Sequence, residues 1–208
     1  MRMMNNHADS AIRMMTDAAT LSTDQDLAWI AASRGGDVQA FNRLVLKWER
    51  RVYNVALRML RDREEAAEVT QESFLSAWRG VRNFRQHAKF STWLYRIVIN
   101  QCLTRLSHRP PGIHLPLTDD EAEPNYPSVR LQITETQPEA LLREEQSRRV
   151  LAAMELLPPN QRAVVELKFF QELTFEEIGV ILDTPQSTVK SRLYSALETL
   201  KSKLGCEI

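Results

Sequence analysis

The chain has 208 residues, of which 43% are hydrophobic and 26% charged, enough for one or two domains with a buried core. Its 27 basic and 27 acidic side chains cancel, and a neutral total taken alone argues against a nucleic-acid partner. Only six Gly and nine Pro, with long stretches of apolar residues at helical spacing, predict an all-α protein. The two Cys residues show neither Cys-x-x-Cys nor Cys/His spacing, so we expect no disulfide framework, no metal and no cofactor.

The neutral total hides a sorting of charges along the chain. Positions 79–109 hold seven Arg or Lys and no acidic residue, whereas 119–145 hold eight acidic residues and two Arg, and 62–72 hold five acidic residues and one Arg. The basic stretch suits phosphates, and the acidic stretches suit a basic or polar partner. This separation of charges therefore indicates more than one partner. No apolar run approaches the length of a membrane span, and positions 1–23 lack a signal-peptide core, so we expect a cytoplasmic protein.

The first domain is predicted to cover residues 24–109, after a disordered tail at 1–23. Its first helix, at 24–33, stops at Gly35-Gly36. Asp37 then caps a long second helix that keeps one apolar stripe over five turns.

A third helix is predicted to begin at Asp62, with acidic residues in a first turn where the helix dipole favours them. One of its faces is polar and mostly acidic, and its members are Glu68, Gln71 and Glu72. From the residues alone, the simplest interpretation is that water solvates this face.

The basic stretch divides into a loop at 82–91 and a helix at 92–106. Cations and aromatic rings are interleaved in it: Arg82, Arg85, Lys89 and Arg96 with Phe84, Phe90, Trp93 and Tyr95. Cations that follow phosphates and rings that stack on unpaired bases are what binding of single-stranded DNA requires. A core role explains Phe90 and Trp93 at least as well, so both interpretations stay open for these rings.

Residues 110–137 are acidic, contain Pro and lack periodicity, which predicts a flexible linker. The second small domain is predicted at 138–208 and consists of four helices. The first two cover 138–157 and 161–170, and the last two are joined by a very short turn.

The last two helices, within residues 174–204, have the sequence form of a helix-turn-helix. Thr174 and Glu177 are spaced as a capping box at the start of the first helix. The second helix follows Pro185 and carries four basic side chains and one acidic one. In such motifs the second helix enters a DNA major groove. An ordinary helical hairpin with a solvated face is the alternative.

Four long segments, in this order and spacing, resemble one family, and they are AFNRLVLKWERRVYNVALRML, EEAAEVTQESFLSAW, FSTWLYRIVINQCL and LPPNQRAVVELKFFQELTFEEIGVILDTPQSTVKSRLYSALETL. The family is that of group 4, or extracytoplasmic-function, sigma factors, and the resemblance covers 24–108 and 138–204. It implies a protein that is not an enzyme. It also implies binding to core RNA polymerase, at the β′ clamp helices and the β flap, and transcription initiation at promoters read at −35 and −10 elements.

The resemblance also implies roles for three sets of side chains. The set that binds core polymerase is Glu68, Gln71 and Glu72. The set that binds −10 DNA is Arg82, Arg85, Lys89, Phe90, Trp93, Arg96 and Asn100, with Asn100 lining the pocket for a flipped base. The set that binds −35 DNA is Ser187, Thr188, Lys190, Ser191, Arg192 and Tyr194. One departure is that the family has Gly-Thr where this chain has Ser187-Thr188. No catalytic residue is implied.

The family also implies an anti-sigma factor as a partner, often one anchored in the membrane. We therefore expect a cytoplasmic, nucleoid-associated protein that such a partner holds at the membrane. Two other classes remain open. A stand-alone helix-turn-helix regulator, with 24–108 as a sensor or dimerisation domain, would bind duplex DNA without polymerase. Against an enzyme or a purely structural helical domain, the sequence has no Ser/His/Asp grouping, Gly-rich phosphate loop or metal-ligand spacing.

Overall fold

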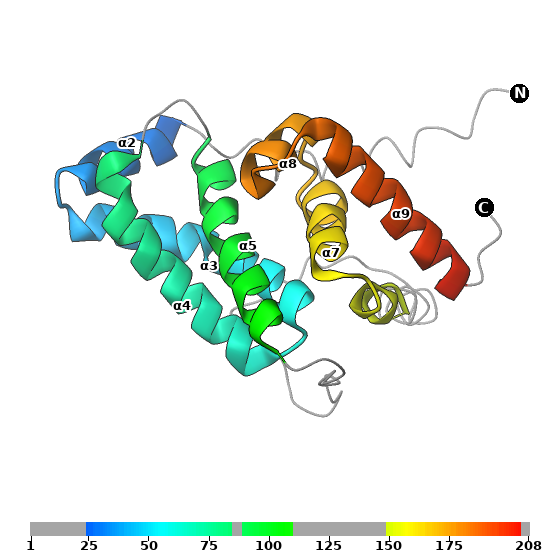
Figure 1. Cartoon of the computed structure of the whole chain (residues 1–208). Helices are drawn as coiled ribbons and strands as arrows, with labels where there is room; N and C mark the ends of the chain where they lie inside the picture. The colour runs from blue at the N-terminus through cyan, green and yellow to red at the C-terminus, as the bar shows by residue number, and fades with distance from the viewer. Residues whose placement is uncertain (1–23, 85–88, 110–148, 205–208) are drawn as a thin grey trace, which may run out of the picture.

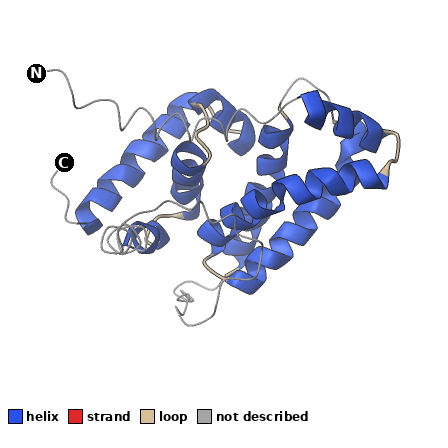
Figure 2. Cartoon of the chain, turned by 180° about the vertical axis from the view of Figure 1, so that it is seen from behind, coloured by secondary structure: helices blue, strands red, loops and turns tan. Residues whose placement is uncertain are grey.

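The structure is a computed structural model that describes residues 24–84, 89–109 and 149–204, and every regular element in these ranges is helical (Figure 1). The reverse view in Figure 2 shows the same two groups of helices side by side. The predicted all-α class is confirmed. The predicted tail, the predicted linker and the start of the helix predicted from 138 lie outside the described residues.

Among its described residues, the N-terminal unit has four α-helices and one short 3-10 turn: α2 (Asp24–Arg34), α3 (Val38–Leu60), α4 (Arg63–Gly80), η1 (Val81–Asn83) and α5 (Phe90–His108). The long α3 packs against α2, α4 and α5. As predicted, the Asp37 carboxylate caps α3, accepting hydrogen bonds from the backbone N–H groups of Gln39 and Ala40 at 2.8 and 3.0 Å. Gly36 makes the reversal before α3 at a φ of 94°, which glycine adopts without steric cost.

The C-terminal unit has helical turns at 149–155, followed by α7 (Pro159–Val165), the π-helix η2 (Glu166–Phe170), α8 (Phe175–Leu182) and α9 (Gln186–Leu204). The sequence predicts one helix over 161–170. The structure begins it two residues earlier and winds its last five residues as a π-helix. Turns of this kind are rare and often lie at functional places, and this one carries Glu166, whose side chain is fully buried.

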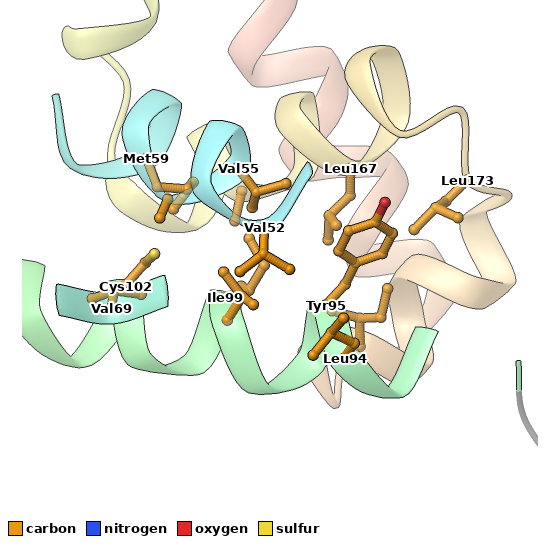
Figure 3. Close-up of a cluster of buried hydrophobic side chains, with 14 of the residues drawn as sticks. Val52, Val55, Met59, Val69, Leu94, Tyr95, Ile99, Cys102, Leu167 and Leu173 are labelled. Atoms are coloured by element: carbon orange, nitrogen blue, oxygen red, sulfur yellow. The ribbon is translucent and has the colours of Figure 1, made fainter. Parts of the chain in front are cut away.

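One hydrophobic cluster joins the two units, as Figure 3 shows. It contains side chains from α3, from α5 and from the C-terminal unit, among them Val52, Val55, Met59, Leu94, Tyr95, Ile99, Leu167 and Leu173. Cys102 lies in the same cluster as a small, fully buried core residue. Burial raises the pKa of the Cys102 thiol to about 12.

Candidate nucleic-acid interface

Helix α8 begins at a capping box and ends in a tight turn that leads into α9. The predicted capping box is confirmed: the Thr174 hydroxyl accepts from the Glu177 backbone N–H at 3.2 Å, and the Glu177 carboxylate accepts from the Thr174 backbone N–H at 3.0 Å. Asp183 ends α8 in the left-handed region, at a φ of 50°. A Cβ at Gly179 would lie 2.9 Å from the backbone oxygen of Thr184, so the chain can turn this closely only with glycine there.

The six predicted −35 residues all lie on α9, most of them on its solvent side. On the opposite side, Val189, Leu193, Ala196 and Leu200 are buried. Four of the six predicted residues are exposed and two are half-buried: Ser187, Lys190, Ser191 and Tyr194, then Thr188 and Arg192. A helix that packs on one side and presents polar and basic groups on the other is suited to lie in a groove of duplex DNA.

The predicted −10 residues, which lie in η1, just before α5 and in α5 itself, divide between surface and core. Arg82, Lys89, Arg96 and Asn100 are exposed, and Arg85 lies outside the described residues. Trp93, Arg96 and Asn100 follow one another at spacings of three and four and therefore lie on one side of α5.

Phe90 is only 2% exposed, and its ring packs against Phe84, Trp93 and Trp48 with centroids 6.0, 5.6 and 6.1 Å away. The core interpretation is therefore the one that the structure supports for Phe90, because a ring so enclosed offers no face to a base. Trp93 is half-buried and keeps part of its surface in solvent.

Tyr95 also turns inward. Its hydroxyl lies 2.6 Å from the Gln171 side-chain oxygen and donates to it. Burial raises the pKa of Tyr95 to about 12, so the phenol stays protonated near neutral pH.

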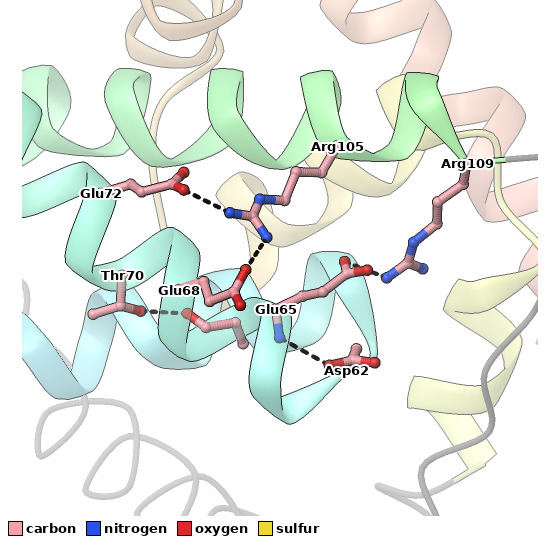
Figure 4. A network of polar contacts seen from close by, with 8 residues as sticks. Asp62, Glu65, Glu68, Thr70, Glu72, Arg105 and Arg109 are labelled. Atoms are coloured by element: carbon pink, nitrogen blue, oxygen red, sulfur yellow. Dashed lines mark hydrogen bonds and ion pairs between the residues drawn. The ribbon is translucent and has the colours of Figure 1, made fainter.

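The acidic face of α4 is exposed and has a cation from α5 beside it, as Figure 4 shows. Arg105 donates to Glu68 at 2.6 Å and to Glu72 at 2.8 Å, and the hydrogen bond with Glu68 raises the pKa of the Arg105 guanidinium. The two carboxylates remain 64% and 52% exposed, and Gln71 is exposed beside them. These three side chains therefore stay accessible to a partner.

Sequence reasoning missed two residues at this face, Arg105 beside it and Leu75 on it. The pairing of Arg105 with Glu68 and Glu72 joins residues on different helices, so no local spacing indicates it. Leu75 is the second, and it is 55% exposed one turn after Gln71.

Within the described ranges, no group of three or more His, Cys, Asp or Glu is placed to hold a metal ion. None of the helices described is long and apolar enough to cross a membrane. The fold and its surfaces thus define a two-unit helical protein, with a helix-turn-helix in one unit and a basic helix next to an acidic face in the other.

Comparisons with known proteins agree with this class. Residues 44–109 match the model described as Sigma-70 region 2, and residues 147–200 match Sigma-70, region 4. The RNA polymerase sigma-H factor of Pseudomonas aeruginosa is 34% identical over 187 residues, which cover 88% of this chain and 96% of that protein. The ECF RNA polymerase sigma-E factor of Haemophilus influenzae is 33% identical over 183 residues, covering 86% and 95%. The chain therefore belongs to the extracytoplasmic-function sigma factors.

Solved structures share the fold. CnrH in complex with the cytosolic domain of CnrY matches with a TM-score of 0.64 at 20% identity, over 89% of this chain and all of that chain. RpoE in complex with the anti-sigma factor NepR, from Bartonella quintana, matches with a TM-score of 0.61 at 19% identity, over 82% and all of that chain. As a sigma factor, the protein is a transcription initiation factor that works with RNA polymerase, and not an enzyme.

Proposed function

We propose that the two units divide promoter recognition between them, with residues 24–109 binding core polymerase and the −10 element and residues 138–208 binding the −35 element. The observation that supports this division most strongly is the exposed side of α9, which carries four of the six predicted −35 residues: Ser187, Lys190, Ser191 and Tyr194. In this proposal α9 enters the major groove, where Lys190 and Arg192 contact phosphates or guanine edges and the neighbouring hydroxyls contribute hydrogen bonds.

The −10 role is assigned to the side of α5 that carries Trp93, Arg96 and Asn100. An Asn amide both donates and accepts hydrogen bonds, which suits the edge of a base that has left the stack. Extruding that base costs a few kcal/mol. The half-buried Trp93 ring and the exposed cations Arg82, Lys89 and Arg96 offset part of this cost by stacking on bases and pairing with phosphates.

The core-binding role is assigned to the exposed face of α4. Glu68, Gln71 and Glu72 offer two carboxylates and an amide, and Leu75 adds an apolar contact on the same face. A face of this composition suits the β′ clamp helices of the polymerase, and the β flap is the proposed contact of the C-terminal unit.

We further propose that an anti-sigma factor controls the protein, which acts at the nucleoid in the cytoplasm and is held at the membrane when that inhibitor is membrane-anchored. The matched CnrH and RpoE structures are complexes with CnrY and with the anti-sigma factor NepR, and this supports the proposal.

Reconstitution with purified core polymerase tests the function as a whole. We expect the chain to co-elute with core enzyme in gel filtration and to direct run-off transcription from a defined set of start sites. Tight binding to a palindromic duplex without polymerase, together with no co-elution, would instead identify a stand-alone regulator.

A further inference from the structure

One aromatic ring of the C-terminal unit contacts two lysines. Phe175 is the first residue of α8, and its side chain is half-buried. The Lys168 ammonium from η2 lies 4.9 Å from the centroid of the Phe175 ring, and the Lys190 ammonium from α9 lies 5.6 Å from it. Both distances are within the range of about 6 Å over which the face of a ring attracts a cation. Side chains of η2, α8 and α9 therefore meet at this ring.

The short turn before α8 determines where the ring lies. Glu172 adopts the left-handed region at a φ of 54°, which is uncommon for a residue other than glycine. Hydrogen bonds hold the next residue on both sides: the Leu173 backbone N–H donates to the Leu167 oxygen at 3.1 Å, and the Leu173 oxygen accepts from the Lys168 ammonium at 3.1 Å. Lys168 therefore stabilises this turn and also contacts the ring that follows it.

The two lysines bring positive charge to one place without a counter-ion. Lys190 is exposed and Lys168 is half-buried, and in the part of the chain that the structure describes neither ammonium forms an ion pair with a carboxylate. Their separation cannot exceed the sum of their two distances to the ring centroid. Successive phosphates of one DNA strand follow one another every 3.4 Å or so along the helix axis. Two cations this close can therefore face neighbouring phosphates of one strand.

We infer that Phe175 is a positioning residue for −35 recognition: its ring holds the Lys190 ammonium on the α8 side of α9 and gathers Lys168 beside it. The inference rests on the proposed −35 role of α9. In a helix-turn-helix the second helix enters the major groove while the first crosses the DNA backbone, and Phe175 begins the first of these helices. Without the ring, the long Lys190 side chain keeps its charge but occupies more rotamers, and ordering it on DNA then costs more entropy.

The substitution Phe175→Leu keeps an apolar side chain and removes the ring, whereas Phe175→Tyr retains the ring. We expect holoenzyme with Phe175→Leu to bind a promoter fragment, taken from a mapped start site, about two- to fivefold more weakly than wild type, the range for an exposed cation–π contact. Phe175→Tyr should bind as wild type does. The matched control is Phe169→Leu, the same change at a 53% exposed ring that contacts no cation among the described residues, and it should also keep wild-type affinity. Equal losses in the two Leu variants, or no loss in either, would overturn the inference.

A double-mutant cycle distinguishes positioning from a purely structural role of the ring. In a background with Lys168→Ala and Lys190→Ala, Phe175→Leu should cost no further promoter affinity, because no cation is left to position. Lys168→Ala alone should lower the slope of log affinity against log salt by about one, whereas Phe175→Leu keeps both charges and should change the slope less. If Phe175→Leu weakened binding equally in the wild-type and lysine-free backgrounds, the ring would act through the fold and the inference would be wrong.

Nuclear magnetic resonance of the free protein tests the contact without DNA and without any variant of the ring. With lysines labelled at Cε, the ring should shift the ε-proton signals of Lys168 and Lys190 upfield of that of Lys201, which is exposed at the other end of α9. Absence of these shifts in the wild-type protein would contradict the inference.

The two measurements together separate this inference from the proposal on which it rests. If the shifts are present but Phe175→Leu costs no promoter affinity, the positioning role is wrong and the −35 role of α9 stands. If Lys190→Ala itself leaves −35 engagement unchanged, the −35 role of α9 is wrong, and the inference fails with it.

Discussion

The two helices that carry the proposed DNA-binding residues, α5 and α9, are built differently. Helix α9 packs one side against its own unit and leaves the other in solvent. Helix α5 packs against α3 and α4 of its own unit and also against α7 and α8 of the other. A helix with one free side offers that whole side to a partner, whereas α5, packed between two units, keeps only a narrower exposed strip that includes Arg96 and Asn100. The comparison teaches that the proposed −35 residues lie on a broad exposed side of α9, whereas the proposed −10 residues share α5 with core positions.

The largest expected effect is on stability, and it distinguishes Phe90 of α5 from Tyr194 of α9. Phe90→Ala empties a core position and should lower the free energy of unfolding by about 3–5 kcal/mol. Tyr194→Ala, at a side chain that is 67% exposed, should change it by no more than about 0.5 kcal/mol. Urea unfolding followed by circular dichroism measures both. If Phe90→Ala is instead stable and loses only −10 binding, the Phe90 ring belongs to the DNA interface and not to the core.

The next effect sharpens the account of the α8–α9 turn. Gly179→Ala places a Cβ 2.9 Å from the Thr184 backbone oxygen, so the turn must shift. We expect a loss of about 1–3 kcal/mol in unfolding free energy, as for overpacked sites, together with weaker −35 engagement. The neighbouring Val180→Ala, at an exposed position, is the control and should retain both properties. Unaltered stability of Gly179→Ala would mean that the turn is looser than described.

A smaller effect tests how α9 meets DNA. Lys190→Ala in the holoenzyme should weaken −35 binding and, if Lys190 contacts a phosphate, lower the slope of log affinity against log salt by about one. Glu198→Gln, on the same helix, is the charge control. If Lys190→Ala keeps the wild-type slope of log affinity against log salt, and its affinity is uniform across −35 variants, Lys190 does not contact the DNA.

The smallest effect concerns the buried side of α5. Because burial raises the pKa of Cys102 to about 12 from its ordinary 9.0, its thiol stays protonated in the folded protein. This protonated thiol contributes stability below pH 9, and the contribution is lost as the pH rises toward 12. In a Cys206→Ser background, alkylation between pH 7 and 10 should be slow until urea unfolds the chain. Fast alkylation of the folded protein would show that α5 is not enclosed.

The sequence alone predicts which side of α9 is buried and which is exposed, but it does not do so for α5. The reason is physical. The stripe through Val189 and Leu193 occupies one side of α9, so helical spacing alone separates core from surface. Around α5 apolar residues lie on several sides, and spacing could not decide whether Phe90 belonged to the core.

Ion pairs between residues distant in sequence could not be predicted either. Arg58 and Glu166 are 108 residues apart, and Arg105 meets Glu68 from another helix. Such pairs depend on how helices pack, which local patterns do not encode. The capping box and the Asp37 cap depend only on neighbours in the chain, and both were predicted correctly.

The most direct measurement crosses protein variants with promoter variants in run-off transcription with core polymerase. Wild type, Asn100→Ala and Lys190→Ala are each tested on promoters altered at the −10 or at the −35 element, with start sites mapped by sequencing. The account predicts that Asn100→Ala loses discrimination only among −10 variants and Lys190→Ala only among −35 variants. If each substitution weakened discrimination at both elements equally, or if wild type ignored both elements, the division of promoter recognition between α5 and α9 would be contradicted.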